Sequence, residues 1–500
     1  MSPLGTSLAQ TWVIGLVYTL PLLNTVVTAA SIPPRDSVIT PRPAIAIKLN
    51  PDARSPSAAG ADIIDSLIQK AHPNPTRAKR DVDFSISPLI TSLSPAEIDK
   101  MIQTAVERDP TYVPANFSNW FQVVFTEAQT EDAAASPEVL QLLNKLAEAP
   151  EVASCQQLIG STRSLPAVQP NDDPLFTEQG YLSGGGVGID AKYAWGFPGG
   201  DGTGTTIIDV ERGWQLEHED LKAANITIVG TGLNINDRYG GNYPHGTSVL
   251  GEILMVDNTI GGVGIATKAQ GHVVGITRTN EDGGPVENRP EAIMEAANNL
   301  KFGDAILLEM QVPDASSTVY PVEIYDAEFD AIRLAVAMGI TVIEPAANNG
   351  TDLDQPILRE GDSTARAFLN RNSPDFRDSG AIIVGAGSPG LPHTRLDFSN
   401  YGSRVDVFAW GENIWTTSVN TSSNYEDIYA PFDGTSGAAP IIAGAVLCIQ
   451  GMVNANRGKK LSPAELRSLI TVGGTPTSKP AEDKIGVQPD LRALIDGGHL

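Results

Sequence analysis

The chain has 500 residues, a formal net charge of −25 and 41% hydrophobic residues. This length can bury a large core and is enough for more than one domain. The negative charge disfavours binding to nucleic acid or to anionic membranes, because both need basic patches. There are two cysteines, Cys155 and Cys448, so the fold cannot depend on a disulfide framework, and Cys448 is expected to be a buried thiol in a core helix.

The amino-terminal end contains an apolar stretch from Trp12 to Val27 that is followed by small residues. This pattern predicts a secretory signal peptide over residues 1–30, although it lacks a charged amino end, so a membrane anchor or a buried helix is the alternative. No other segment is expected to be long and apolar enough to span a bilayer. The protein is expected to be secreted, and retention in a vacuole or in the cell wall is the alternative. The chain carries glycosylation sequons at Asn116, Asn225 and Asn420, which is compatible with secretion.

Two further segments precede the main domain. Residues 31–80 are rich in Pro, Ser and Ala and end in the basic run 77–80, which predicts a low-complexity pro-segment with a dibasic processing site; a basic surface turn is the alternative. Residues 81–168 carry helical signals, including a capping box at Ser94–Glu97 and an amphipathic stretch at Pro137–Ala149. This second segment is expected to be a propeptide or an accessory helical region that assists folding or blocks a cleft.

A buried strand is predicted over Gly204–Val210, because its β-branched run is continuous and therefore suits a parallel strand covered on both faces. The strand ends in Asp209, at the carboxyl edge where α/β sheets place their active sites. A buried aspartate there can fix the tautomer of a histidine and stabilise its imidazolium. The alternative is a cap for the following loop.

Two candidate partners for Asp209 stand at predicted helix starts. His245, one of six histidines, begins a stretch of small and apolar residues at helical spacing. Ser436 lies in the segment Gly434–Pro440, directly before an apolar run. A serine at the start of a buried helix is well placed for a nucleophile, since the helix amino-terminus favours developing negative charge. An ordinary helix N-cap is the alternative for Ser436.

The order Asp209, His245, Ser436, in these contexts, resembles the subtilisin-like serine peptidases. Further segments are similar to that family in the same order, over about residues 170–485: Leu216–Leu221, Val256–Ala266, Thr341–Gly350 and Leu396–Gly402. The resemblance implies an α/β fold with three layers and a mainly parallel sheet between helices. It also implies a peptidase domain at 169–490, preceded by a smaller pro-region as in a zymogen.

The resemblance implies a secreted serine endopeptidase that acts on protein or peptide substrates, needs no cofactor for its chemistry and is inhibited by its own propeptide. Ser436 would attack the scissile carbonyl, His245 would move the proton and Asp209 would orient His245. Asn348 would donate to the oxyanion beside the Ser436 backbone N–H, with Ala347 where a glycine is usual. Asn349 is the competing residue for the oxyanion role, and it is also a sequon.

Several positions depart from the family pattern. Asp209 is followed by Val210-Glu211 instead of Thr/Ser-Gly, and Glu309 stands where a small residue normally lines the primary specificity pocket. Glu309 is therefore expected to bind the substrate and to favour a basic residue before the cleaved bond. Gly434 is the second expected substrate-binding residue, because a small residue near Ser436 lets the substrate backbone approach.

A structural calcium is the one metal that the resemblance implies, with Asp220 and Asn258 as side-chain ligands; a capping Asp220 beside a plain glycine-rich loop is the alternative. Two other functions fit parts of the pattern. One is a catalytically impaired binding protein on the same fold. The other is a serine peptidase that uses Glu and Asp in place of histidine, which the His245 segment disfavours. A structural or adhesive surface protein would leave the triad unexplained.

Overall fold

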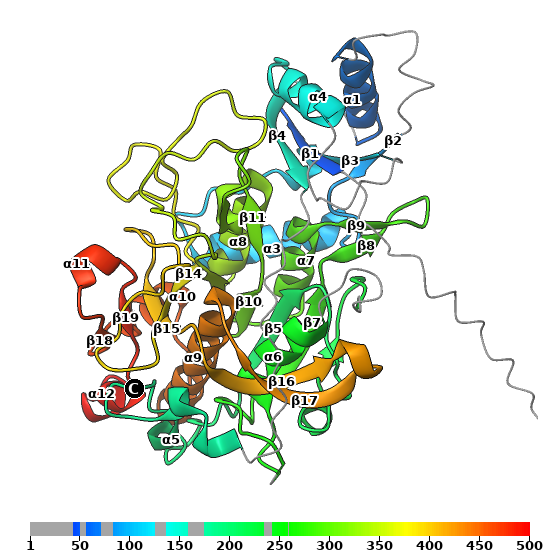
Figure 1. Cartoon of the computed structure of the whole chain (residues 1–500). Coiled ribbons are helices and arrows are strands. Elements are labelled where there is room, and N and C mark those ends of the chain that lie inside the picture. The colour runs from blue at the N-terminus through cyan, green and yellow to red at the C-terminus, as the bar shows by residue number, and fades with distance from the viewer. Residues whose placement is uncertain are drawn as a thin grey trace, which may run out of the picture. The chain divides into compact units, whose positions relative to one another are not determined.

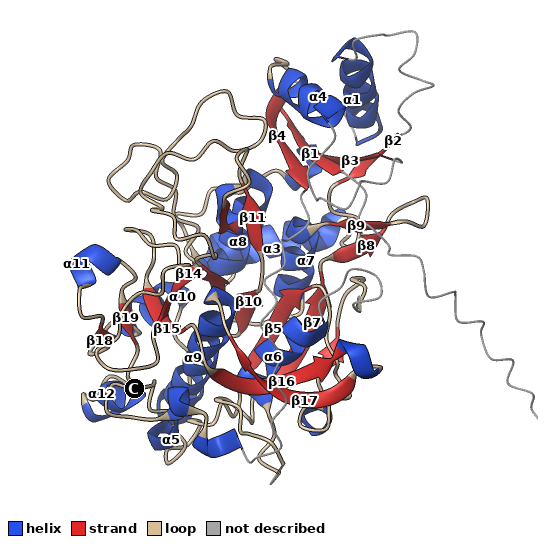
Figure 2. Cartoon of the chain, in the orientation of Figure 1, coloured by secondary structure: helices blue, strands red, loops and turns tan. Residues whose placement is uncertain are grey.

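The computed structural model describes residues 44–50, 57–71, 84–125, 137–158, 175–234, 243–258 and 260–500. The predicted signal peptide and the basic run at 77–80 lie outside the described residues. Figure 1 traces the chain by residue number, and Figure 2 shows its helices and strands.

The amino-terminal unit is a four-stranded antiparallel sheet in the order β2-β3-β1-β4. Its strands are β1 (Ala44–Leu49), β2 (Phe84–Pro88), β3 (Trp120–Phe125) and β4 (Val152–Leu158), and its helices are α1 (Ser57–Ala71), α3 (Pro95–Arg108) and α4 (Pro137–Ala147). Alternation along β1 decides the packing: Ile45 and Ile47 face a small core with α1 and α4, while Ala44 and Ala46 face a second core shared with α3.

The expected division at residue 80 is therefore corrected. β1 pairs with both β3 and β4, so the folded unit includes residues 44–71 and crosses the predicted boundary. It is also a mixed α/β unit where helices alone were expected. The helical signals themselves are confirmed, since Ser94 and Glu97 form the capping box at the start of α3.

The larger unit is built on a nine-stranded sheet in the order β18-β19-β15-β14-β13-β10-β5-β7-β6. Its long strands run parallel, and the strand expected to end in Asp209 is β5, between β10 and β7. The strands are β5 (Thr206–Glu211), β6 (Thr227–Ile228), β7 (Gln270–Gly275), β10 (Ala305–Leu308), β13 (Thr341–Pro345), β14 (Ile382–Gly387), β15 (Val407–Trp410), β18 (Thr475–Pro476) and β19 (Val487–Gln488).

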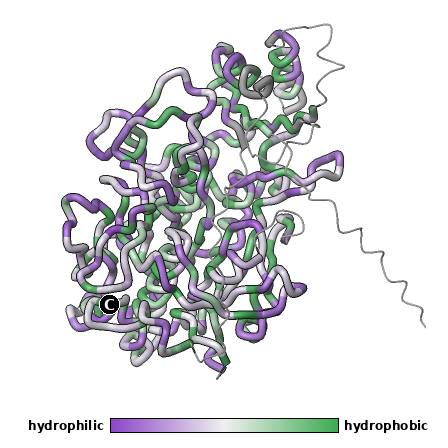
Figure 3. The backbone as a smooth tube through the Cα atoms, in the orientation of Figure 1, coloured by the Kyte–Doolittle hydropathy of each residue, from purple (hydrophilic) through white to green (hydrophobic). Residues whose placement is uncertain are grey.

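Helices cover both faces of this sheet. On one face, Ile208 and Leu308 pack with α7 (Arg289–Asn298) and α8 (Asp326–Ala337); on the other, Ile207 and Leu307 pack with α6 (Tyr243–Leu254) and α9 (Thr435–Arg457). Figure 3 shows apolar stretches along the central strands and helices. The chain thus has the expected three-layer α/β fold, with a mainly parallel sheet between helices.

The remaining elements are short hairpins and helices around this frame. The two-stranded ribbons are β8 (Thr277–Thr279) with β9 (Pro285–Glu287), β11 (Gln311–Pro313) with β12 (Val319–Pro321), and β16 (Ile414–Asn420) with β17 (Glu426–Phe432). The ribbon β16–β17 runs along α6 (Figure 2). The short helices are α5 (Ala191–Ala194), α10 (Pro463–Leu469), α11 (Pro480–Asp483) and α12 (Leu491–Asp496).

Helix α9 is the core helix of the larger unit. Within the described part of the chain it is the one helix long and apolar enough to cross a membrane, which corrects the expectation that only the amino-terminal end qualifies. The most apolar part of α9 is 94% buried inside the fold, so the length and hydropathy of this helix reflect its packing against the sheet. Cys448 is fully buried in this helix, as expected.

The two units contact each other through α7 and α8. The Glu291 carboxylate accepts hydrogen bonds from the backbone N–H groups of Thr91 and Ser92 at 2.7 and 2.6 Å. Gln156 of β4 donates to Glu328 of α8 at 2.6 Å. The amino-terminal unit therefore packs on the side of the sheet that α7 and α8 cover, while α6 and α9 cover the other side.

Candidate active site

His245 lies in the first turn of α6 and is 7% exposed. The next residue must be glycine, because a Cβ on Gly246 would lie 2.4 Å from the carbonyl oxygen of Gly213 and 2.6 Å from the Trp214 ring. This close approach holds the start of α6 against the loop that follows β5. The fold therefore brings the imidazole to the carboxyl edge of the sheet.

The acid that contacts this imidazole is Glu211, the last residue of β5. His245 Nδ1 lies 3.0 Å from Glu211 Oε2, and the carboxyl is 3% exposed. The expected partner, Asp209, lies two residues earlier on the strand, and its Oδ2 instead accepts a 2.6 Å hydrogen bond from Trp214 Nε1. The structure thus places Glu211, where Asp209 was expected, against the histidine, because the strand continues beyond the predicted end at Val210.

A sequence signal for Glu211 was present. The family pattern places a glycine two residues after the acid, and Glu211-Arg212-Gly213 keeps that spacing, with arginine at the usual Thr/Ser position. Two residues after Asp209, where this pattern would place the glycine, the chain has Glu211. The β-branched run that ends at Asp209 was the stronger local pattern, and it led to an acid two residues before Glu211.

Asp209 and Glu211 form a buried pair on one face of β5, since alternate residues of a strand point the same way. Burial raises the pKa of both carboxyls well above the ordinary range, and the charge of Glu211 raises that of Asp209 further. Burial lowers the pKa of His245 to about 4, against the charge of Asp209, which acts to raise it. The imidazole is therefore neutral in all but strongly acidic solution.

Ser436 stands at the second position of α9, as predicted, and its side chain is partly exposed. Phe432, just before α9, links it to the histidine: its ring packs edge-on against the His245 ring, with centroids 5.3 Å apart. The same ring lies 3.4 Å from the Cβ position of Gly437, the neighbour of Ser436. The start of α9 therefore lies beside the start of α6, at the position expected for a nucleophile and its base.

Asn348 follows β13 and faces the start of α9. Its Oδ1 accepts hydrogen bonds from Thr435 N at 2.8 Å and Thr435 Oγ1 at 3.0 Å, and its Nδ2 lies 3.5 Å from the Cβ position of Gly434. Ala347, where glycine is usual, holds a left-handed φ of +75°. The competing Asn349 is exposed and directs its amide to Thr351 instead. Of the two asparagines, Asn348 is the one that the structure places at Ser436.

Glu309 directly follows β10, and its backbone N–H donates to the Val210 carbonyl at 3.2 Å. Its carboxyl is 5% exposed and neither oxygen has a hydrogen-bond partner of good geometry. Burial raises its pKa well above the ordinary range, the charges of Asp209 and Glu211 raise it further, and an interaction with the Ser436 hydroxyl lowers it. The carboxyl expected in the specificity pocket thus lies among the reacting groups.

The candidate calcium ligands offer hard oxygens. Asp220 Oδ1 is buried and has no hydrogen-bond partner, whereas Oδ2 accepts from Gly262 N at 3.2 Å. Asn258 Oδ1 accepts from Ile260 N at 2.9 Å. An unpartnered carboxylate oxygen beside an amide oxygen fits the chemistry of a calcium ligand set. Among the described residues, no group of three or more acidic, His or Cys side chains could hold a metal.

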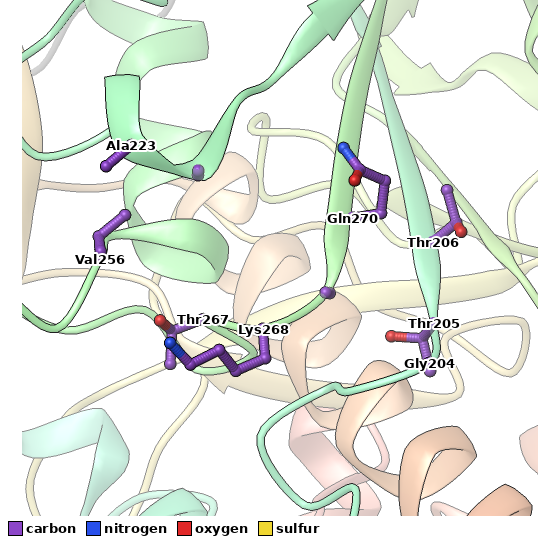
Figure 4. A pocket seen from close by; sticks show the side chains of 10 residues that line it. Gly204, Thr205, Thr206, Ala223, Val256, Thr267, Lys268 and Gln270 are labelled. Atoms are coloured by element: carbon purple, nitrogen blue, oxygen red, sulfur yellow. The ribbon is translucent and has the colours of Figure 1, made fainter.

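One surface hollow lies away from all these residues. Its volume is about 490 Å³ and it opens at the amino-terminal ends of β5 and β7, between Gly204, Lys268 and Gln270 (Figure 4). His245, Glu211 and Asn348 are at the carboxyl edge of the same sheet. The hollow is therefore no part of the candidate active site.

Comparison with known proteins gives the family of the chain. The chain is 27% identical over 300 residues to an intracellular serine protease of Paenibacillus polymyxa, covering 58% of this chain and 80% of that protein. It is 26% identical over 370 residues to an extracellular protease of Xanthomonas campestris pv. campestris, covering 67% of this chain and 57% of that protein. It spans only 58% of subtilisin-like protease 1 of Pseudogymnoascus destructans, with 26% identity over 285 residues, which is 56% of this chain.

Among solved structures, fervidolysin from Fervidobacterium pennivorans, a keratinolytic enzyme related to subtilisin, matches with a TM-score of 0.52. The match covers 81% of this chain and 60% of that one at 19% identity, so it bears on the fold alone. The subtilase family model matches residues 202–474, more than half of the chain and all of the site described above from Glu211 to Ser436. The chain therefore belongs to the subtilase family of serine peptidases.

Proposed function

We propose that the chain is a serine endopeptidase in which Ser436, His245 and Glu211 form the catalytic triad. Ser436 Oγ attacks the scissile carbonyl while His245 takes its proton and then returns it to the leaving amine. Glu211 holds the Nδ1 side of the ring, so that Nε2 is the nitrogen that serves Ser436. The observation that carries this proposal is the 3.0 Å contact between His245 Nδ1 and Glu211 Oε2, beside the amino-terminus of α9.

Negative charge that develops on the substrate oxygen would be met by two donors. The backbone N–H of Ser436 points out of the first turn of α9, where the helix dipole also favours an anion. The Asn348 amide is the second donor, and Thr435 fixes its orientation. Gly434, with a φ of +101°, would leave room for the substrate backbone between them.

Labelling with an organophosphorus reagent tests the nucleophile. The wild-type protein is expected to bind one equivalent covalently and to lose peptidase activity in parallel, because the reagent reacts with an activated serine. Ser436→Ala should not be labelled, whereas Ser422→Ala, an exposed serine outside the site, should be labelled like the wild type. Equal labelling of the wild type and Ser436→Ala would show that Ser436 is not the nucleophile.

The amino-terminal unit supports a propeptide role for the region before the peptidase domain. It is an α/β unit with one small core of its own, and it packs on α7 and α8 through a shared apolar cluster and through polar contacts such as Lys48–Asp330 at 2.9 Å. We propose that it is an inhibitory propeptide of a secreted zymogen. The exposed sequons Asn116 and Asn225 are accessible to glycosylation, and Asn349 is expected to stay unmodified because a glycan there would crowd the site.

For calcium we propose a structural role at Asp220 and Asn258. The ion would supply positive charge against a buried carboxylate and take no part in the chemistry. Without the ion, burial raises the pKa of Asp220 to about 7, while its hydrogen bond with Gly262 lowers it. The folded state then holds a proton that the unfolded state has released, so stability falls as the pH rises from about 4 to 7.

This linkage gives an expected result for stability. In a chelating buffer, the melting temperature should fall between pH 5 and pH 8 more steeply for the wild type than for Asp220→Asn, which cannot titrate. Calcium in excess should remove the difference by stabilising the ionised carboxylate. Thermal unfolding followed by circular dichroism measures this. Parallel curves for both proteins, unchanged by calcium, would exclude an ion at Asp220.

A further inference from the structure

Four buried carboxyl groups lie close to the candidate catalytic residues Ser436 and His245. Asp209 and Glu211 come from β5, Glu309 follows β10, and Glu252 comes from α6. All four residues are at least 95% buried. Six of their eight carboxyl oxygens have no hydrogen-bond partner, including both oxygens of Glu309 and both of Glu252. Glu211 Oε2 lies against His245 and Asp209 Oδ2 accepts from Trp214, so these two carboxyls have a polar partner. A buried ionised carboxylate without any partner is too costly to persist, so Glu309 and Glu252 are kept neutral.

The surroundings supply little positive charge. The cation that lowers the pKa of Glu211 is Arg212. Arg212 itself forms an ion pair with Glu287 of β9. Toward Glu309, β5 presents Asp209 and Glu211, α6 presents Glu252, and α9 presents the uncharged Ser436. In the described part of the chain, no lysine or arginine compensates Glu309.

We propose that Glu309 works in its protonated, neutral form beside Ser436, and that the centre is therefore built to cut peptide bonds in acidic surroundings. This inference rests on the proposed peptidase function and adds to it a fourth group in the active centre. It also gives a reason for a glutamate at a position where a small residue is usual.

The chemistry of the serine hydroxyl explains why the protonation state matters. A hydroxyl has one proton to donate. An ionised Glu309 accepts that proton in a hydrogen bond and so competes with His245 for it. It also places a full negative charge beside the oxygen that becomes an anion in the tetrahedral intermediate, which raises the barrier. A neutral Glu309 leaves the serine proton to His245 and adds no charge.

The histidine fits the same conditions. Because burial lowers the pKa of His245 to about 4, the imidazole stays neutral and can act as a base well below pH 6. Burial and the neighbouring carboxylates act in the opposite direction on Glu309 and raise its pKa. Between these two titrations both groups are neutral, so the window of activity lies on the acidic side of that of a site with an ordinary histidine.

The rate of organophosphorus labelling of Ser436, measured from pH 4 to pH 9, tests the inference. For the wild type we expect a rise through about pH 4 and a fall on the alkaline side as Glu309 ionises. If only the neutral form reacts, the rate two pH units above that midpoint is about 1% of the plateau. Glu309→Gln, which stays neutral, should keep its rate on the alkaline side and so exceed the wild type there by about 100-fold.

Matched variants make the outcome specific. Glu344→Gln neutralises another fully buried carboxyl with two unpartnered oxygens, on the neighbouring strand β13 but facing the α7 and α8 side. It should keep the wild-type profile. Glu309→Ser provides a second neutral variant if the glutamine variant does not fold. A wild-type rate that stays on its plateau to pH 9, or neutral variants with the same alkaline fall, would overturn the role of Glu309. Absence of labelling at every pH in folded wild-type protein would instead reject the proposed peptidase function.

Discussion

Replacing Glu211 with Gln is expected to lower kcat for peptide hydrolysis by about 10,000-fold, with a much smaller change in KM. The amide keeps the size of the side chain, but it can present an N–H group to His245 Nδ1. The ring would then be held in the tautomer that cannot accept the Ser436 proton, and the imidazolium formed in the transition state would lose its counter-charge. Steady-state kinetics on a peptide substrate, with folding checked by the melting temperature, measure this loss.

Asp209→Asn is the control, because it neutralises the neighbouring carboxyl on the same face of the same strand. Asp209 accepts a hydrogen bond from the buried Trp214 indole, and an asparagine oxygen can still accept it. Its kcat is therefore expected to fall by less than about tenfold, the size of one lost net hydrogen bond. The reverse result, with a large loss for Asp209→Asn and a small one for Glu211→Gln, would restore Asp209 as the orienting acid.

The sequence predicts the frame of this site well, because the frame depends on local patterns. A continuous β-branched run predicts the buried strand β5, and small residues before apolar runs predict the starts of α6 and α9 that carry His245 and Ser436. The capping box at Ser94 correctly predicts the start of α3. Each of these signals lies within a few residues of the feature that it specifies.

The features that the sequence did not reveal depend on contacts between distant segments. The choice between Asp209 and Glu211 is made by Trp214, which occupies one carboxyl, and by the close approach of Gly246 to Gly213, which brings His245 to the other. The early start of the amino-terminal unit depends on pairing of β1 with β3 and β4, more than 70 residues away. The position of the Glu309 carboxyl beside Ser436 likewise follows only from packing β10 against β5 under α9.

Replacing Asn348 with Ala is expected to lower kcat by about 100- to 1,000-fold while KM changes little. An oxyanion donor interacts with charge that develops only in the transition state, so its loss acts on the chemical step and leaves ground-state binding almost unchanged. The hydrogen bonds from Thr435 fix the Asn348 amide toward the start of α9, so no rearrangement is needed as the charge forms. Measurement of kcat and KM at the pH of maximal activity separates the two effects.

Asn349→Ala is the matched control, since it removes the neighbouring amide without touching the site. Asn349 is exposed and contacts Thr351, so its loss should leave kcat within about twofold of the wild type, as for other surface substitutions. A large loss in Asn349→Ala together with normal kinetics in Asn348→Ala would assign the oxyanion role to Asn349. A KM increase in Asn348→Ala with unchanged kcat would show that the amide binds the substrate in its ground state, and the stabilisation of the anion would then rest on the Ser436 N–H and the α9 dipole.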